Sequence, residues 1–189
     1  MTGARLRLFL LAAASLTLRA ADPALESASV KLEKLENGQA RAGETILLTP
    51  AEINAWVAAK VPEEIPQGIR DPRIEMGTDT ATASAMVDFL KMEQSRGKTI
   101  NRAMGLMLEG ERPLKVSVRI TSAGGKCTVY LTRVEVSGVG VEGAVLDFLI
   151  NNFFLPLYPN AKIGEPVDMD FDIDHFQIRP DGLRITIKK

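Results

Sequence analysis

The sequence predicts an α+β domain in which a curved antiparallel sheet wraps around a long, mostly apolar helix, with short flanking helices. Three observations favour this class. Segments with alternating apolar and polar residues occur in pairs joined by glycine or proline turns, as in antiparallel strands with one face in solvent. Helix-capping patterns occur near the N-terminus, and residues 142–158 form a nearly continuous apolar segment.

The composition is typical of one globular domain. The chain has 189 residues, of which 46% are hydrophobic and 25% are charged. Its 23 basic and 24 acidic residues leave no basic excess for a phosphate backbone, so a nucleic-acid partner is not expected. The single cysteine, Cys127, excludes an intrachain disulfide framework and a cysteine-based zinc site. With one histidine, His175, the chain is expected to have no metal, no cofactor and no enzymatic activity.

Residues 1–21 have the pattern of a secretory signal peptide. Arg5 and Arg7 precede an apolar run, and the small residues Ala20 and Ala21 follow it. The run is too short to span a bilayer comfortably, which takes about 20 residues. We therefore expect cleavage near Ala20 or Ala21 and a single domain, 22–189, that is periplasmic or secreted; an uncleaved N-terminal anchor or a cytosolic start is the alternative.

Two helices are predicted in the first third of the domain. Residues 23–36 carry apolar side chains at helical spacing, and Asn37 and a glycine end the pattern, although residues 30–33 would also suit a strand. After a short extended stretch at 45–48, Thr49 and Glu52 have the spacing of a capping box. The second helix therefore begins near Thr49, and Pro62 is expected to end it.

The remaining pattern is mainly that of strands. Strands are predicted at 73–76 and 80–90, a polar loop at 92–98 and a short helix at 100–108. A hairpin is predicted at 114–136 around Gly124 and Gly125. Alternation from Val167 through Ile178 predicts another strand, and a turn at 180–182 leads to a last strand at 183–187.

Residues 142–158 are the most unusual segment. A helix that is apolar nearly all round must be buried on most sides or contact lipid, and this one is too short to cross a bilayer. Roughly ten large apolar side chains at about 1.5–3 kcal/mol each would contribute on the order of 15–30 kcal/mol of gross burial. The helix is therefore expected to be the centre of the core.

Several of these segments together resemble a known group. The strings LTPAEINAW, MVDFLKM, TRVEVSGVGVEGAVLDFLINNFF and DIDHFQIRPDGLRITI look like those of bacterial LmeA-like and YpmS-like exported proteins. That group is similar in shape to the tubular lipid-binding (TULIP) superfamily, in which a sheet wraps a long helix and holds lipid. The resemblance covers roughly residues 45–187. It implies a fold and an apolar ligand, and it supplies no catalytic residues.

Together these patterns predict an exported, non-enzymatic binding protein for lipid or another hydrophobic small molecule, with transient membrane contact as a further expectation. Its groove would lie between sheet and helix. The expected groove residues are Val145, Phe148, Leu149, Phe153 and Leu157 on the helix, with Ala83 and Val87 on a strand. Plain core packing is the alternative for these residues, and a ligand-free envelope interaction or scaffold module is the alternative function. The oligomeric state stays open.

Three further motifs suggest chemistry but have simpler explanations. Aspartates 168, 170, 172 and 174 are expected to form a solvated acidic strand face, because the glycine and glutamate of a calcium loop are missing. Residues 96–99 resemble the end of a phosphate-binding loop, but Met92 replaces its first glycine. Asp174 and His175 suggest half of a hydrolytic triad, but no Gly-x-Ser-x-Gly elbow is present.

Overall fold

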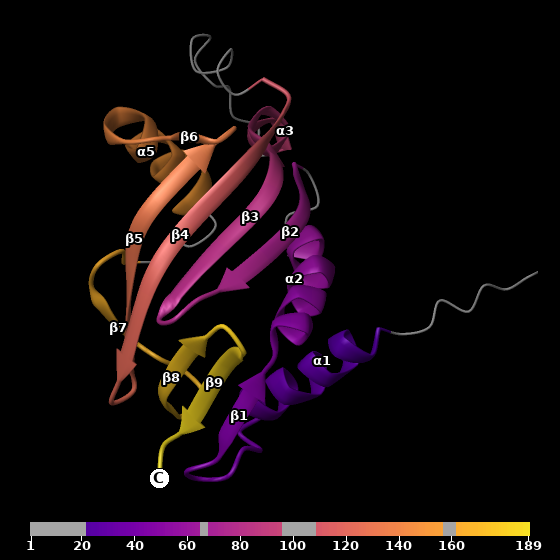
Figure 1. Ribbon diagram of the computed structural model, residues 1–189, viewed down its shortest axis with the longest axis vertical. Helices are drawn as coiled ribbons and strands as arrows, with labels where there is room; N and C mark the ends of the chain where they lie inside the picture. Colours follow the sequence, from indigo (N-terminus) through magenta and orange to yellow (C-terminus); the bar gives the residue numbers. More distant parts are fainter. Residues whose placement is uncertain (1–21, 65–67, 96–108, 157–161) are drawn as a thin grey trace, which may run out of the picture.

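The computed structural model describes residues 22–64, 68–95, 109–156 and 162–189 (Figure 1). They form an α+β domain with antiparallel sheets and few helices, which confirms the predicted class in outline. None of the described helices has the length and apolar content needed to cross a bilayer. The elements are α1 (Pro23–Glu36), β1 (Thr45–Leu48), α2 (Pro50–Glu64), β2 (Ile69–Met76), β3 (Thr80–Asp88), α3 (Phe89–Ser95), β4 (Glu111–Ala123), β5 (Lys126–Val136), β6 (Val139–Gly140), α5 (Gly143–Leu149), η1 (Ile150–Phe154), β7 (Pro166–Asp168), β8 (Ile173–Arg179) and β9 (Gly182–Ile187).

The strands form two sheets that lie one above the other in Figure 1. The larger sheet has the order β2-β3-β4-β5-β6, and β7 pairs with the far end of β5. The smaller sheet has the order β1-β9-β8. The predicted β4–β5 hairpin is confirmed: Gly124 and Gly125 both have positive φ, +57° and +77°, as a two-residue type I′ turn requires.

The smaller sheet and the first two helices share one hydrophobic core. Ile46 of β1 and Ile185 and Ile187 of β9 are buried against Ala28 and Leu35 of α1. The helix predicted at 23–36 and the extended stretch at 45–48 are confirmed with those bounds. The predicted end of the second helix is wrong, because α2 continues through Pro62 to Glu64.

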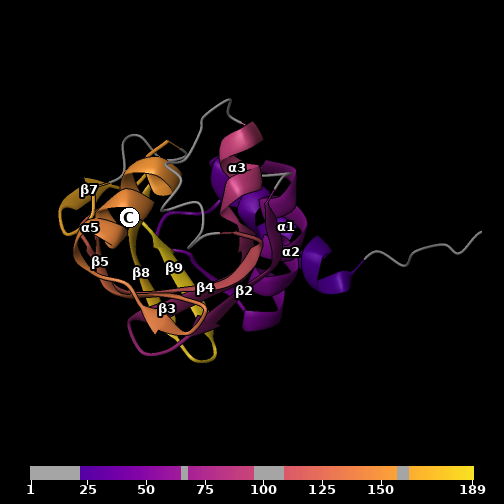
Figure 2. The same ribbon diagram turned by 90° about the horizontal axis from the view of Figure 1, so that it is seen from above.

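The larger sheet has its own core. Phe89 and Met92 of α3 pack with Val87, Leu149 and Phe153, all of them buried. Viewed from above in Figure 2, α3 and α5 lie on the same side of the curved sheet, over its opposite margins. The two helices therefore bring apolar side chains from both margins onto one face.

Two polar side chains form hydrogen bonds with the backbone of edge strands, one in each sheet. Asn54 of α2 accepts a hydrogen bond from Ile74 N (2.8 Å) and donates one to Ile74 O (2.9 Å). Ser122 of β4 does the same for Phe176 of β8, accepting from its nitrogen (2.8 Å) and donating to its oxygen (2.7 Å). Each side chain occupies the place of a neighbouring strand, so the edges of β2 and β8 do not present these groups to another chain.

We expect Asn54→Ala to lower the free energy of unfolding by about 1–3 kcal/mol, because it leaves two partly buried backbone groups of Ile74 unpaired. Urea denaturation followed by circular dichroism measures this loss. Asn151→Ala is the control, since Asn151 is exposed and a change of about 0.5 kcal/mol or less is expected there. Equal effects of the two variants would contradict a structural role for the Asn54 amide.

The predicted loop at 92–98 is wrong over its first part, where the chain is helical. The strand expected to reach Leu90 ends at Asp88, and α3 begins at Phe89. Asp88 accepts a hydrogen bond from Lys91 N (3.0 Å), which satisfies a free amide of the first turn as an N-cap does. Phe89 and Met92 then face the core instead of solvent. The helix predicted at 100–108 lies outside the described residues.

The continuous strand predicted from Val167 is also wrong. β7 ends at Asp168 and β8 begins at Ile173, because the chain leaves the larger sheet and enters the smaller one. Phe171 and Asp172 have positive φ, 59° and 54°, which breaks the alternation between them. The four aspartates therefore do not form the expected row on one strand face.

The apolar segment at 142–158 is helical in part. It forms α5 and then the π-turn η1, in which Leu155 N donates to Ile150 O five residues earlier. The described helix ends at Phe154 and is thus shorter than predicted. Pro156 has no amide hydrogen with which to continue it, and residues 157–161 lie outside the description.

Candidate apolar binding site

A pocket of about 280 Å³ lies between the larger sheet and the helical segments α3, α5 and η1. Its volume is near the lower end of the range of about 300–1,000 Å³ found for small-molecule sites. Every residue that lines it is aliphatic or aromatic or is a methionine. The lining consists of Ile69, Val87, Phe89, Met92, Leu114, Val116, Val118, Val129, Leu131, Val134, Leu146, Leu149, Ile150, Phe153, Phe154 and Ile163.

Strand β4 forms the long axis of the pocket floor. Leu114, Val116 and Val118 alternate along it and therefore face the same side. At about 3.4 Å per residue, the floor from Leu114 to Val118 is roughly 14 Å long. In the neighbouring strands, Ala83 and Val134 are both paired with Val116. The floor therefore runs along β4, with β3 and β5 on either side of it.

The roof of the pocket is an aromatic group. The Phe153 ring lies edge-to-face with Phe89, at a centroid distance of 4.9 Å and an angle of 73°. Phe148 packs on Phe153 in a similar way, at 6.0 Å and 69°. Edge-to-face pairs of this kind fix ring orientation beyond what burial alone provides. These contacts hold η1 over the sheet.

The sequence-predicted groove residues divide into three groups. Val87, Leu149 and Phe153 line the pocket. Phe148 packs behind Phe153, and Val145 lies outside the lining. Ala83 also lies outside it; its side chain is exposed, although its strand partner Val116 lines the pocket. Leu157 lies outside the described residues.

Two lining residues mark where the pocket meets solvent. Phe154 is 37% exposed and Ile163 is 41% exposed. Ile163 forms a bridge with Val129, so this opening lies at the Val118–Val129 end of the floor. Apolar side chains at a pocket mouth are accessible to an entering hydrophobic ligand.

One functional candidate was missed by reasoning from the sequence. Arg112 pairs across the sheet with Val87 and precedes Leu114 by two residues, so it lies on the pocket face of β4. Among the described residues, its Nε is the buried side-chain nitrogen that lacks a hydrogen-bond partner. A signal was present: in the alternation of residues 112–118, an arginine takes the place of an apolar residue.

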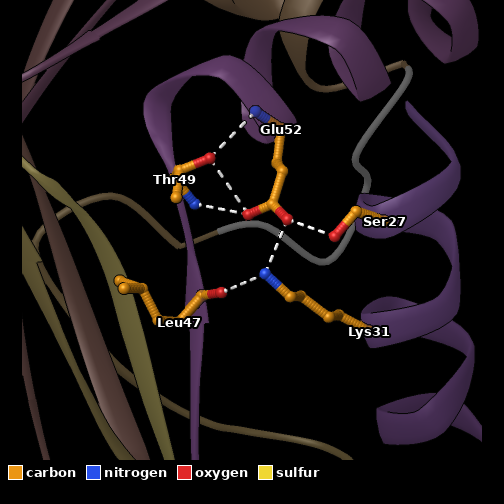
Figure 3. Close-up of polar contacts among 5 residues, drawn as sticks. All are labelled: Ser27, Lys31, Leu47, Thr49 and Glu52. Atoms are coloured by element: carbon orange, nitrogen blue, oxygen red, sulfur yellow. Dashed lines mark hydrogen bonds and ion pairs between the residues drawn. The ribbon is translucent and has the colours of Figure 1, made fainter. Parts of the chain in front are cut away.

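The buried carboxylate of Glu52 is structural (Figure 3). Its oxygens accept hydrogen bonds from Lys31 Nζ (2.6 Å), from the Ser27 hydroxyl, and from Thr49 N (2.7 Å) and Oγ1 (3.0 Å). Burial raises the pKa of Glu52, but the hydrogen bonds from Lys31, Ser27 and Thr49 outweigh burial and lower it from 4.5 to about 2. Such a group stays ionised at neutral pH and has no proton to exchange with a substrate.

A second hollow, of about 300 Å³, surrounds His175 on the solvent face of the smaller sheet. His175 Nδ1 lies 2.7 Å from Asp174 Oδ2, which is the geometry of two triad members. The hydroxyl across the sheet, on Thr186, is hydrogen-bonded to Thr45 at 3.2 Å. The side chains of His175 and Asp174 are 34% and 42% exposed, so the pair is open to water. The hollow therefore lacks an activated nucleophile next to the imidazole.

Cys127 and the acidic residues provide no further reactive group. Burial raises the pKa of the Cys127 thiol, which disfavours the nucleophilic thiolate. In the parts of the chain that the structure describes, no three histidine, cysteine, aspartate or glutamate side chains are grouped to hold a metal ion. The apolar pocket is thus the most distinctive site on the described surface.

Comparisons with models of known protein families, with curated proteins and with solved structures find no significant match.

Proposed function

We propose that this protein is a non-enzymatic binding protein for an elongated apolar ligand, such as a lipid acyl chain, held in the pocket over β4. The observation that carries the proposal is the lining, in which every side chain is apolar and two side chains, Phe154 and Ile163, remain exposed. A polar metabolite would lose its hydrogen bonds to water there without replacement. An alkyl chain loses none and gains about 0.8 kcal/mol for each buried methylene group.

The shape of the site supports a chain in preference to a compact molecule. The pocket floor extends roughly 14 Å along β4, whereas the volume of the whole pocket is only about 280 Å³. The ligand would lie along the strand beneath Phe153 and η1. In this proposal the larger sheet curves around α5 and η1 as in the LmeA-like and TULIP proteins, and the protein is exported and meets membranes transiently.

We expect Val116→Phe to fill the middle of the pocket and to weaken ligand binding by roughly tenfold or more, because the added ring occupies the volume of several methylene groups. Lys115→Phe is the matched control. Lys115 is the adjacent residue on the opposite, solvent-facing side of the same strand. The measurement is titration with N-phenylnaphthylamine, a neutral apolar dye that fluoresces when it leaves water.

The same titration tests the alternative function. If the dye binds to the wild type and to Lys115→Phe but not to Val116→Phe, the result supports the pocket as the ligand-binding site. If wild type binds neither the dye nor a neutral alkyl chain, the pocket is core space only. The chain would then be a ligand-free interaction or scaffold module.

A further inference from the structure

We propose that Arg112 is an anion anchor at one end of the apolar pocket, so that the ligand is a single-chain anionic amphiphile whose carboxylate or phosphate pairs with the guanidinium. This inference rests on the proposed function, because it assumes that the pocket holds an alkyl chain. It adds the charge of the ligand and the direction in which the ligand lies.

The strand register places Arg112 on the pocket face of β4, next to residues that line the pocket. Its partner across the sheet, Val87, lines the pocket, and so does Leu114 two residues along the same strand. Directly paired residues and alternate residues of a strand project from the same face. Arg112 therefore extends the row that continues as Leu114, Val116 and Val118.

The guanidinium has no counter-charge within the described residues. Its Nε is buried without a hydrogen-bond partner, although the residue as a whole is only partly buried. The adjacent acid, Glu111, projects from the opposite face and binds Arg70 through two hydrogen bonds of 2.9 and 2.6 Å. Asp88, the partner of Glu111 across the sheet, is bound to Lys91. Both nearby carboxylates are thus already paired.

The buried Nε of Arg112 is costly for the fold. A buried donor without an acceptor carries its full desolvation penalty, and the penalty is larger for a charged group. A bound carboxylate or phosphate would remove it, because two oxygens fit the planar guanidinium fork. A bound anion would therefore supply the acceptor that the buried Nε lacks in the ligand-free protein.

The two ends of the pocket are chemically different. Arg112 lies beyond Leu114 at one end, whereas the exposed Ile163, bridged to Val129, marks the other. The anionic head would therefore lie at Arg112, and the alkyl tail would extend along β4 toward Ile163. A neutral or cationic head group would leave the guanidinium unpaired or face a like charge.

The test is displacement of N-phenylnaphthylamine by four ligands that share one chain: dodecanoate, dodecyl phosphate, dodecanol and dodecylammonium. We expect the wild-type protein to bind the anions roughly 10-fold to 100-fold more tightly than the alcohol, the range for one charge-assisted contact. Dodecylammonium should bind least well. The order of dodecanoate and dodecyl phosphate distinguishes a carboxylate head from a phosphate head.

Arg112→Met should make dodecanoate and dodecanol bind equally, and Arg112→Lys should keep a preference for anions. Arg119→Met is the control, because Arg119 lies on the opposite face of β4 over the Tyr130 ring. The ligand-free stability gives a second readout. Arg112→Met should raise the Tm, whereas loss of a residue that only supports the fold would lower it.

The possible results separate the two proposals. Equal binding of dodecanoate and dodecanol by the wild type would overturn the anchor and leave the apolar pocket standing. A lower Tm for Arg112→Met with unchanged discrimination would also overturn it. If none of the ligands and no dye bind, the proposed function itself falls, and the anchor with it.

Discussion

Replacing Glu52 with alanine is expected to lower the free energy of unfolding by roughly 2–3 kcal/mol, because it removes the charge-assisted hydrogen bonds from Lys31, Ser27 and Thr49. The carboxylate is 6% exposed and lies between α1, the end of β1 and the first turn of α2. Its loss leaves Lys31 without its counter-ion and Thr49 N without its cap. Urea denaturation at neutral pH measures the change.

The matched control is Glu44→Ala, which removes a second glutamate paired with a lysine of α1. Glu44 binds Lys34 near the surface, where water screens the pair. We expect a clearly smaller loss of stability for Glu44→Ala than for Glu52→Ala. Equal losses of stability in the two variants would contradict the conclusion that the buried contacts of Glu52 hold α1 and α2 together.

The pH dependence of the free energy of unfolding provides a second test of the Glu52 contacts. The pKa of Glu52 is lowered from 4.5 to about 2, so the folded state holds this proton less tightly than the unfolded state. The stabilisation is therefore complete above pH 4.5 and is lost as the pH falls toward 2, and it amounts to at most roughly 3 kcal/mol. Glu52→Ala should lack this part of the pH dependence. An unchanged acid profile in the variant would contradict the linkage.

The second large effect is expected at Phe153. Phe153→Ala removes a ring that is 7% exposed and that contacts both Phe89 and Phe148. Burial of this kind is worth about 3–5 kcal/mol for phenylalanine, and we expect about 3 kcal/mol because one side of the ring already faces the pocket. Urea denaturation measures the loss.

Phe171→Ala is the control for this substitution, because Phe171 is 51% exposed and a change of about 0.5 kcal/mol or less is expected. The enlarged apolar space of Phe153→Ala should also bind benzene, and benzene should raise the Tm of that variant more than that of the wild type. Equal destabilisation by the two substitutions would show that the Phe153 ring does not support the larger core.

The parts of the fold that could be predicted from the sequence are those specified by local chemistry. The capping box of Thr49 and Glu52 is present: Thr49 N donates to Glu52 (2.7 Å), and Glu52 N donates to Thr49 Oγ1 (3.3 Å). The glycine turn of the β4–β5 hairpin and the β8–β9 turn also form as predicted. In each case the deciding residues are within a few positions of one another.

The wrong predictions concern segments whose structure depends on distant partners. Phe89 and Met92 continue a pattern that suits a strand and then a loop, but the core formed with Leu149 and Phe153 draws them into α3. Alternation at 167–173 suggested one strand, yet the chain must change sheets there. Periodicity cannot reveal which sheet a strand will join.

The candidate site was predictable only in part. The apolar character of 145–153 pointed to Leu149 and Phe153, but only the strand register shows that Val116 and Arg112 share the pocket face of the larger sheet with Val87. Register depends on pairing between strands that are distant in sequence. The available signal was Arg112, an arginine in a row of alternating apolar residues. This signal points to an anion site only because the neighbouring Glu111 is already paired with Arg70.

The pairing of β1 with β9 also constrains how the chain can fold. Thr45 and Thr186 face each other across the smaller sheet, although 141 positions separate them in the sequence. Closing so long a loop makes the contact order high and the search slow. During synthesis, Ile46 and Leu48 have no strand on which to pair until β9 has been made. The core beneath the N-terminal helices therefore stays incomplete until Ile185 and Ile187 of β9 join it.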